Sequence, residues 1–402
     1  MNKTLYSKKS GSALVLVLFA VVILSIMGLG LLTLALNSRI FAIRTASDIK
    51  ARCAADAGLT KALFEMNKQL KVKPWSDDYL PEAVDEILLS NDNTTFTYTV
   101  TGNVSDGYVI ESTGKSGHTQ KTVRSVLQFQ GPFECPIFTE DSIDLKNGTI
   151  VDWLNFTEED GNLKIGTNST EEAAVDAKMG VTINSDVAVG FGGDPDVVIS
   201  ASHATITGDT YALTERQVLT PVIVPEWLES TLSAGTIEND TTIAVSGKYD
   251  EIDLGNSETI IIDGEVTLYI IGDIILGNSA ELQVVDGTTN PNASLIIYIG
   301  GDFEGKNGSS INNLAEDATK VKIYGLDSCE SMLFKNSCDL YGAIYAPNAD
   351  VIFYNSADAF GSVVAESFEQ KNSATFTYDA LLRNVSVNDE AVRFVIKRWN
   401  ER

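Results

Sequence analysis

Residues 11–37 read GSALVLVLFAVVILSIMGLGLLTLALN, and the run from Ala13 to Leu36 within them carries no charge over 24 residues. A helix needs about 20 apolar residues to cross the hydrocarbon core of a bilayer. The apolar region of a cleaved secretory signal is shorter, about 7–15 residues, and ends at a small-residue site of a kind that does not follow Leu36. The stretch therefore predicts a transmembrane helix over residues 12–36 that stays on the mature protein.

The helical pattern continues beyond this span. From Ile40 to Leu70, apolar residues recur at spacings of three and four, which is typical of an amphipathic helix. The pattern ends at Lys73-Pro74, because proline does not continue a helix. We expect an extension of the long helix over residues 37–73, and a helix of this length needs a partner surface.

The charge of the chain is unevenly distributed around a formal net charge of −26. Residues 1–73 hold 11 Lys and Arg against 3 Asp and Glu, whereas residues 74–402 hold 18 against 52. Such an acidic body repels nucleic acid, so we expect no nucleic-acid partner. Basic residues before the span favour a cytoplasmic N-terminus, although Arg39 and Arg44 after it oppose this orientation. We expect a single-pass protein of the cell membrane, with its acidic C-terminal body outside the cytoplasm.

Residues 74–130 change to a strand pattern. Three segments, 94–101, 108–113 and 122–129, alternate between polar and apolar residues. Turn signals rich in Gly, Asn and Asp separate them. The pattern predicts a small antiparallel β region over residues 74–130 that could pack on the long helix.

From Gly131 onward, short strands are broken by a repeated corner sequence. LGNS at 254–257 recurs at 276–279, and Lys-Asn-Gly or Lys-Asn-Ser begins at 146, 306, 335 and 371. Steps of 17–29 residues between successive Asn positions, at 256, 278, 307, 336, 355 and 372, fit the coils of a β-solenoid. Asn and Gly tolerate left-handed corners, and stacked Asn side chains can hydrogen-bond between coils. We expect a right-handed parallel β-helix over residues 131–402, with a β-sandwich as the alternative and a crossing at 222–227.

Residues that could carry chemistry are sparse. His118 and His203 have no Cys or His neighbour at the spacing of a metal site. Two oxygen-rich loops, 190–196 and 286–292, lack the spacing of a calcium loop and read as turns. A polysaccharide-active β-helix enzyme would need a carboxylate cluster in one groove, with the candidates Asp250, Asp253, Asp263 and Asp273. We expect no catalytic residue, no metal and no cofactor, and we keep that enzyme, tethered to the membrane, as the alternative function.

The four cysteines do not form a disulfide scaffold. They lie at Cys53, Cys135, Cys329 and Cys338 without C-x-x-C spacing. If the body is outside the cell, Cys329 and Cys338 could form a disulfide, and free thiols are an equal alternative.

The N-terminal motif Lys8-Lys9-Ser10-Gly11, followed by a small residue and an apolar helix, resembles the leader of type IV pilins and type II secretion pseudopilins. The resemblance implies a prepilin-type leader at 1–11 and cleavage by the prepilin peptidase between Gly11 and Ser12. The match is best to minor pilins with a PilX-type N-terminus. Residues 53–59, CAADAGL, resemble that subgroup's Ala-x-x-Ala-Glu/Asp-Ala-Gly stretch, so the likeness covers residues 1 to about 70.

One position departs from the pilin pattern. Most pilins carry Glu at the fifth mature position, where this chain has Leu16. That Glu is thought to pair with the amino terminus of a neighbouring subunit. Its absence resembles pseudopilins at a filament tip, and it implies a tip or initiating role.

A second resemblance lies near the C-terminus. The stretches YGAIYAPNA at 341–349, FGSVVA at 360–365 and FTYDAL at 376–381 look like an uncharacterised domain found behind such N-termini. That domain has no assigned activity, so the likeness bears on architecture alone. Together the two resemblances imply a minor pilin-like or pseudopilin-like subunit, on a pilus or at the cell surface. Its implied partners are the prepilin peptidase, the membrane and other pilin subunits, which bind through the helix. The displayed body is expected to serve adhesion or partner binding through an unknown extracellular ligand.

Overall fold

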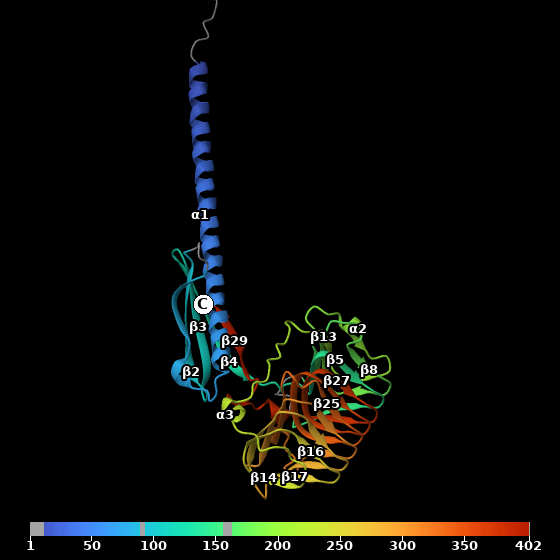
Figure 1. Cartoon of the computed structure of the whole chain (residues 1–402). Helices are drawn as coiled ribbons and strands as arrows, with labels where there is room; N and C mark the ends of the chain where they lie inside the picture. The colour runs from blue at the N-terminus through green and yellow to red at the C-terminus, as the bar shows by residue number, and fades with distance from the viewer. Residues whose placement is uncertain (1–11, 89–92, 156–162, 402) are drawn as a thin grey trace, which may run out of the picture. The chain divides into compact units, whose positions relative to one another are not determined.

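The computed structural model describes residues 12–88, 93–155 and 163–401. The chain divides into two compact units (Figure 1). The helix–sheet unit comprises Met1–Gln128 and Phe394–Arg402, and the parallel-sheet unit comprises Phe129–Arg393. The expected class is confirmed in its main features, because the fold is mainly β with one long N-terminal helix, a small antiparallel sheet and a large parallel sheet.

Helix α1 runs over 58 residues, Ser12–Gln69. Its first part is rich in Leu, Ala and Ile, of which Leu and Ala are strong helix formers. Buried positions begin only at Ala51 and then recur at spacings of one to four through Leu70. The predicted helix is therefore one continuous element with two environments. Its described side chains are almost all exposed up to residue 50, and from residue 51 one face of the helix packs on a sheet.

The small sheet has five antiparallel strands in the order β1-β2-β3-β4-β29. Its expected strands are confirmed as β2 (Thr95–Asn103), β3 (Gly107–Ser116) and β4 (Thr119–Gln130), with β1 (Glu82–Ile87) at one edge and a short 3-10 helix η1 (Asp77–Tyr79) before it. Helix α1 approaches β3 closely at Gly114, where a Cβ atom would lie 2.0 Å from the carbonyl oxygen of Ala51. Glycine at this position is what allows the helix and the sheet to meet.

The C-terminal strand corrects the expected domain boundary. Residues 131–402 were expected to form one β-solenoid domain, but β29 (Arg393–Glu401) pairs beside β4 in the small sheet. Asn67 of α1 fixes this strand through two hydrogen bonds, accepting from the Phe394 amide at 2.7 Å and donating to its carbonyl at 3.1 Å. Phe394 also packs edge-on against Tyr108, with 5.1 Å between ring centroids. The weak alternation of this segment indicates a strand without showing which sheet it joins.

The large sheet is parallel and is built from two runs of short strands. The first run has the bounds β5 Ile137–Leu145, β6 Ile150–Leu154, β7 Lys164–Thr167, β8 Val175–Ala177, β9 Thr182–Ile183, β10 Asp186–Val189, β11 Ile199–Ser200, β12 Thr205–Ile206 and β13 Thr210–Ala212, with α2 Pro195–Val198 before β11. The second run comprises β14 Thr241–Ile243, β15 Gly247–Tyr249, β16 Ile252–Leu254, β17 Thr259–Ile262, β18 Glu265–Ile270, β19 Ile274–Leu276, β20 Glu281–Val284, β21 Ser294–Ile299, β22 Phe303–Gly305, β23 Ser310–Asn313, β24 Val321–Gly325, β25 Ser331–Phe334, β26 Asp339–Phe353, β27 Ala359–Gln370 and β28 Thr375–Asp379, with η3 Ala318–Lys320 and η4 Ala380–Arg383.

The pairing repeats every three strands. β14 pairs with β17, β17 with β20 and β20 with β23, all in parallel and in register. Equivalent side chains therefore stack in columns, and one buried column runs Ile260, Leu282, Ile311 and Leu340. Along many of the strands, such as β18 and β20, buried apolar side chains alternate with more exposed ones because one face of the sheet covers this core.

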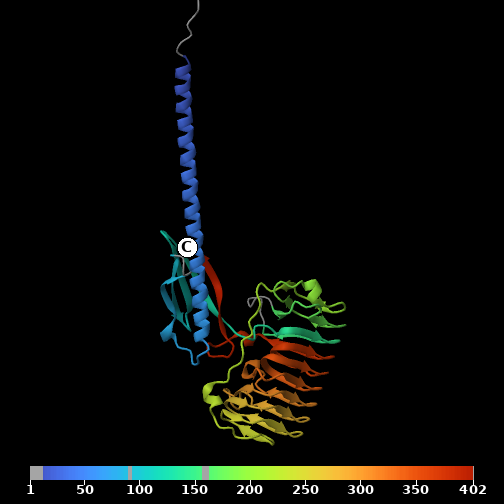
Figure 2. The same ribbon diagram turned by 45° about the horizontal axis from the view of Figure 1, so that its top comes forward.

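The stacking order differs from the chain order. β5 pairs with β27, so the first run continues the stack from the end of the second run. Figure 2 shows the result within the parallel-sheet unit, with green strands at one end, orange and red strands in the middle and yellow strands at the other end. The chain passes from β13 to β14 through residues 213–240, hereafter the crossing segment, which contains α3 (Glu226–Glu229). A crossing was expected near this place, at 222–227.

Candidate functional site

The first half of α1 is an exposed apolar surface. Every large apolar side chain from Leu14 to Leu36 is about half exposed or more, from 46% for Ile23 to 77% for Leu14. Within the described residues, α1 is the helix long and apolar enough to cross a membrane. An apolar surface of this size is unfavourable in water, since burial stabilises by about 25 cal/mol per Å². The helix therefore indicates membrane anchoring.

The predicted leader, residues 1–11, lies outside the described residues. Lys8, Lys9 and Gly11 belong to the part of the chain on which the structure is silent, and Ser12 is the first residue of α1. Leu16, at the position where most pilins have Glu, is 70% exposed on the helix surface. This end of the helix therefore presents an apolar side chain at the position where the pilin pattern has a charged Glu.

A second exposed part of α1 lies between the apolar run and the sheet. Ile40, Phe41, Ile43 and Ile49 are 47%, 67%, 56% and 57% exposed. They alternate with charged residues and come before the first buried position, Ala51. Residues 37–50 rise about 21 Å along the axis at about 1.5 Å per residue. Apolar side chains exposed on such a mixed surface fit contact with another protein or with the membrane interface.

The repeated corners of the parallel sheet form a column of asparagines. Asn278 Nδ2 donates to Asn256 Oδ1 at 2.9 Å, and the same contact joins Asn336 to Asn307 at 3.2 Å and Asn372 to Asn355 at 3.1 Å. The residue after each Asn is a Ser or Gly with a left-handed backbone, for example Ser279 at φ 57° and Gly308 at φ 68°. The hydrogen bonds expected between stacked asparagines are therefore present.

Asn147 extends this column. The Ser373 amide donates to the Asn147 carbonyl at 3.1 Å, so the Lys-Asn-Gly corner that comes first in the sequence stacks after the one that comes last. The Gly148 amide then donates to Met179 at 3.2 Å. The stack of corners thus continues from residues 371–373, near the end of the unit, to residues 146–148, near its start. In the next corner of the stack, Met179 stands where the earlier corners have Asn.

The four candidate carboxylates occupy turns and strand surfaces. Asp273 Oδ1 accepts a hydrogen bond from the Asp302 amide in the next turn at 2.8 Å, and Asp263 Oδ1 accepts from Asn290 Nδ2 at 2.9 Å. Asp250 and Asp253 are exposed. Two of the four carboxylates therefore hold successive turns together, and no group of three metal-binding side chains occurs among the described residues.

The two oxygen-rich loops have local hydrogen bonds typical of turns. Asp286 Oδ1 accepts from Thr288 Oγ1 at 2.7 Å and from the Thr289 amide at 2.6 Å, and these bonds lower the pKa of Asp286. Asp194 caps α2 by accepting from the Asp196 amide at 3.1 Å. These are the arrangements by which Asp stabilises turns and helix starts.

Cys329 and Cys338 are separate, buried free thiols in this structure. Ser309 Oγ donates to Cys338 Sγ at 3.2 Å, and Cys329 packs near Gly325. Burial raises the pKa of each thiol to about 12, so both are protonated near neutral pH. The disulfide considered for this pair is not formed here.

Comparisons with known proteins give limited matches. Residues 221–385, less than half of the chain, match a domain of unknown function, DUF7305. No curated protein matches the chain. The chain is similar to the crystal structure of competence-associated pilin ComZ from Thermus thermophilus at 12% identity and a TM-score of 0.21, covering 89% of this chain and 97% of that one. It is also similar to the Shewanella frigidimarina ice-binding protein_1 DUF3494 domain (13% identity, TM-score 0.35, 61% and 94% covered) and to a glycosylated ice-binding protein from Arctic yeast (15%, 0.26, 61% and 90%).

Proposed function

We propose that this chain is a minor pilin-like or pseudopilin-like subunit with a PilX-type N-terminus. The prepilin peptidase cleaves between Gly11 and Ser12, and residues 12–36 lie in the membrane. The parallel-sheet unit is a right-handed β-solenoid displayed outside the cytoplasm, on a pilus or at the cell surface. It serves adhesion or partner binding without catalysis. The leader motif and the bare apolar first half of α1 support this proposal.

The observation that carries the proposal is the exposed mixed surface at residues 40–49. A simple membrane anchor needs only the apolar run, whereas a subunit of a helical bundle also needs apolar contacts outside the bilayer. Ile40 and Ile43 are three residues apart and share one face of the helix, and Phe41 is exposed on an adjacent face. Fully burying one large apolar side chain stabilises by about 1.5–3 kcal/mol, so burial of these side chains against neighbouring helices would stabilise a bundle.

Leu16 refines the assembly role. An unpaired charge in lipid is costly, so the common Glu at this position is tolerated only when a neighbouring subunit pairs with it. A subunit with Leu16 needs no such neighbour. We infer a position at the tip or at initiation, and an even distribution of the protein along a filament shaft, seen by immunogold labelling, would contradict it.

The solenoid part of the proposal is supported by the three-strand period and the stacked asparagine column. A display role is also consistent with the net charge of the parallel-sheet unit, −31 from 43 acidic and 12 basic residues. Such a charge keeps a displayed domain soluble and repels polyanions. We propose display in preference to polysaccharide cleavage because Asp263 and Asp273 already bind neighbouring turns.

Photo-crosslinking in the native membrane tests the helix contact. A photoreactive phenylalanine analogue replaces Phe41 in one variant and Tyr79 in a matched control, because both side chains are highly exposed in the helix–sheet unit. We expect Phe41 variants to crosslink to another pilin-like subunit and Tyr79 variants to remain uncrosslinked. Crosslinks from residue 41 to lipid alone would indicate a simple anchor.

A further inference from the structure

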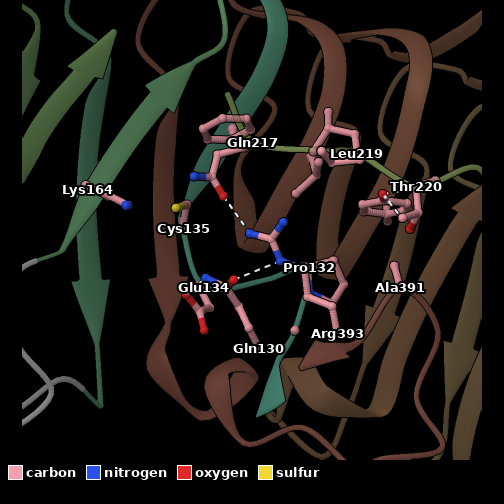
Figure 3. Close-up of a pocket in the computed structure, with 15 residues that line it drawn as sticks. Gln130, Pro132, Glu134, Cys135, Lys164, Gln217, Leu219, Thr220, Ala391 and Arg393 are labelled. Atoms are coloured by element: carbon pink, nitrogen blue, oxygen red, sulfur yellow. Dashed lines mark hydrogen bonds between the residues drawn. The ribbon is translucent and has the colours of Figure 1, made fainter. Parts of the chain in front are cut away.

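The parallel-sheet unit contains a cavity of about 70 Å³ that plays no part in the function proposed above. Figure 3 shows its residues, which come from distant parts of the chain: the segment that enters the unit (Gln130), strand β7 (Lys164), the crossing segment (Gln217) and the end of the unit (Arg393). These residues are separated by tens to hundreds of positions and form no motif, so no sequence pattern predicts the group.

Arg393 is held in place by neutral partners. Its Nε donates to Gln130 Oε1 at 2.9 Å, and one terminal nitrogen donates to Gln217 Oε1 at 2.7 Å, as the dashed lines in Figure 3 show. Gln130 is itself fixed, because its amide nitrogen donates to Glu134 Oε2 at 2.6 Å. Two of the five N–H groups of the guanidinium are therefore used to orient it, which leaves donors for a ligand.

Among the residues that the structure describes, two cationic side chains of this cavity lack an ion pair although the unit around them is rich in carboxylates. The unit carries 43 acidic residues, yet neither Arg393 nor Lys164 has an ion pair within the described part of the chain. A partly buried cation without an anionic partner is unfavourable. The nearby Arg216, in contrast, forms an ion pair with Glu140, and Lys322 forms one with Asp389 at 3.4 Å. The lining also holds one carboxylate, that of Glu134, whose Oε2 accepts a hydrogen bond from Gln130. Two partly buried cations against this one carboxylate leave the lining with a net positive charge, which favours an anionic ligand.

The size and walls of the cavity narrow the class of anion. A volume of about 70 Å³ is well below the roughly 300–1,000 Å³ of pockets that bind drug-sized molecules, so the cavity suits a small ligand. Pro132, Leu219 and Val364 line it beside the polar groups. The acidity of the whole unit repels polyanions, whereas charges within a Debye length of about 8 Å decide the binding of a small ion. A planar guanidinium pairs with a carboxylate through two parallel hydrogen bonds.

We propose that this cavity binds a small aliphatic carboxylate through the Arg393 guanidinium, with the Lys164 ammonium adding charge and the apolar wall holding the alkyl group. The carboxylate oxygens accept hydrogen bonds from Arg393, and no covalent step is involved. This inference does not rest on cleavage or membrane insertion, so either proposal can fail without the other.

Isothermal titration of the full chain in detergent micelles, with propionate as the probe, tests the site. We expect saturable binding that Arg393→Gln weakens at least tenfold and Arg393→Lys weakens less. The matched control Arg216→Gln removes an exposed, paired arginine of the crossing segment and should change the affinity less than twofold. Thermal unfolding midpoints within a few degrees of the wild type confirm that the variants fold.

A second variant keeps the test decisive if Arg393→Gln does not fold. Leu219→Trp replaces an aliphatic side chain with a bulkier indole ring that fills the cavity without removing charge. This variant should abolish propionate binding. Absence of propionate binding by the folded wild type, or equal binding by Arg393→Gln, would overturn the proposal. Binding of phosphate without binding of propionate would show that the carboxylate assignment is wrong.

Discussion

Replacing Phe353 by alanine should unfold the parallel-sheet unit at much lower denaturant concentration. Phe353 is fully buried, and its ring stacks on Phe334 with 4.3 Å between centroids and 5° between planes. It also lies 5.9 Å from the ring of Phe368 in the next turn. Phe→Ala changes in protein cores cost about 3–5 kcal/mol, of which an aromatic pair contributes about 0.5–1.5 kcal/mol. We expect the upper part of this range, because the ring contacts aromatic residues on both sides.

Urea denaturation followed by tryptophan fluorescence measures the effect, with Phe191→Ala as the control. Phe191 belongs to the same unit but is 62% exposed, so its removal should change the free energy of unfolding by less than about 0.5 kcal/mol. Equal effects of the two substitutions would refute the stacked core. A loss of about 3 kcal/mol or more for Phe353→Ala alone would agree with it.

Three further substitutions test separate contacts. Gly114→Ala should destabilise the helix–sheet unit by about 1–3 kcal/mol, because its Cβ would lie 2.0 Å from the Ala51 carbonyl oxygen; Gly287→Ala, with open space around it, is the control in thermal unfolding. Gln370→Leu should stabilise the parallel-sheet unit by about 1–3 kcal/mol in urea denaturation, since Gln370 is fully buried and neither amide atom has a hydrogen-bond partner among the described residues; a loss of stability would point to a partner for this amide. Asp339 is exposed as a residue, but desolvation of its carboxyl group raises its pKa, so its contribution to stability is present below the ordinary Asp value and is lost as pH rises through the raised value. Asp339→Asn should flatten the unfolding free energy against pH in this range, and an unchanged profile would contradict the assignment.

The corner column was predictable from the sequence because its physics is local. A left-handed backbone position favours Gly or another residue that tolerates positive φ. Stacked Asn amides pair only when the corners align, so the repeat of LGNS at 254 and 276 predicts two adjacent corners. The steps of 17–29 residues follow from the loop lengths between corners. The exposed helix was equally visible, since its apolar run needs no tertiary information.

The order of the stack could not be read in this way. Asn147 and Asn372 lie in similar corner sequences, Lys-Asn-Gly and Lys-Asn-Ser, and the two corners are neighbours in the stack. Neither tripeptide contains information that predicts this pairing. The position of β29 was missed for a related reason, because its partner β4 lies more than 260 residues earlier. The Arg393 cavity is lined by residues that are far apart in the sequence, so no local pattern predicts it.

The sequence of the mature N-terminus, determined on protein purified from its native membrane, tests the central claim most directly. Our account predicts a first residue at Ser12, with loss of this processing when the prepilin peptidase is absent. An intact start at Met1 would contradict it, and α1 would then be the anchor of a tethered surface protein.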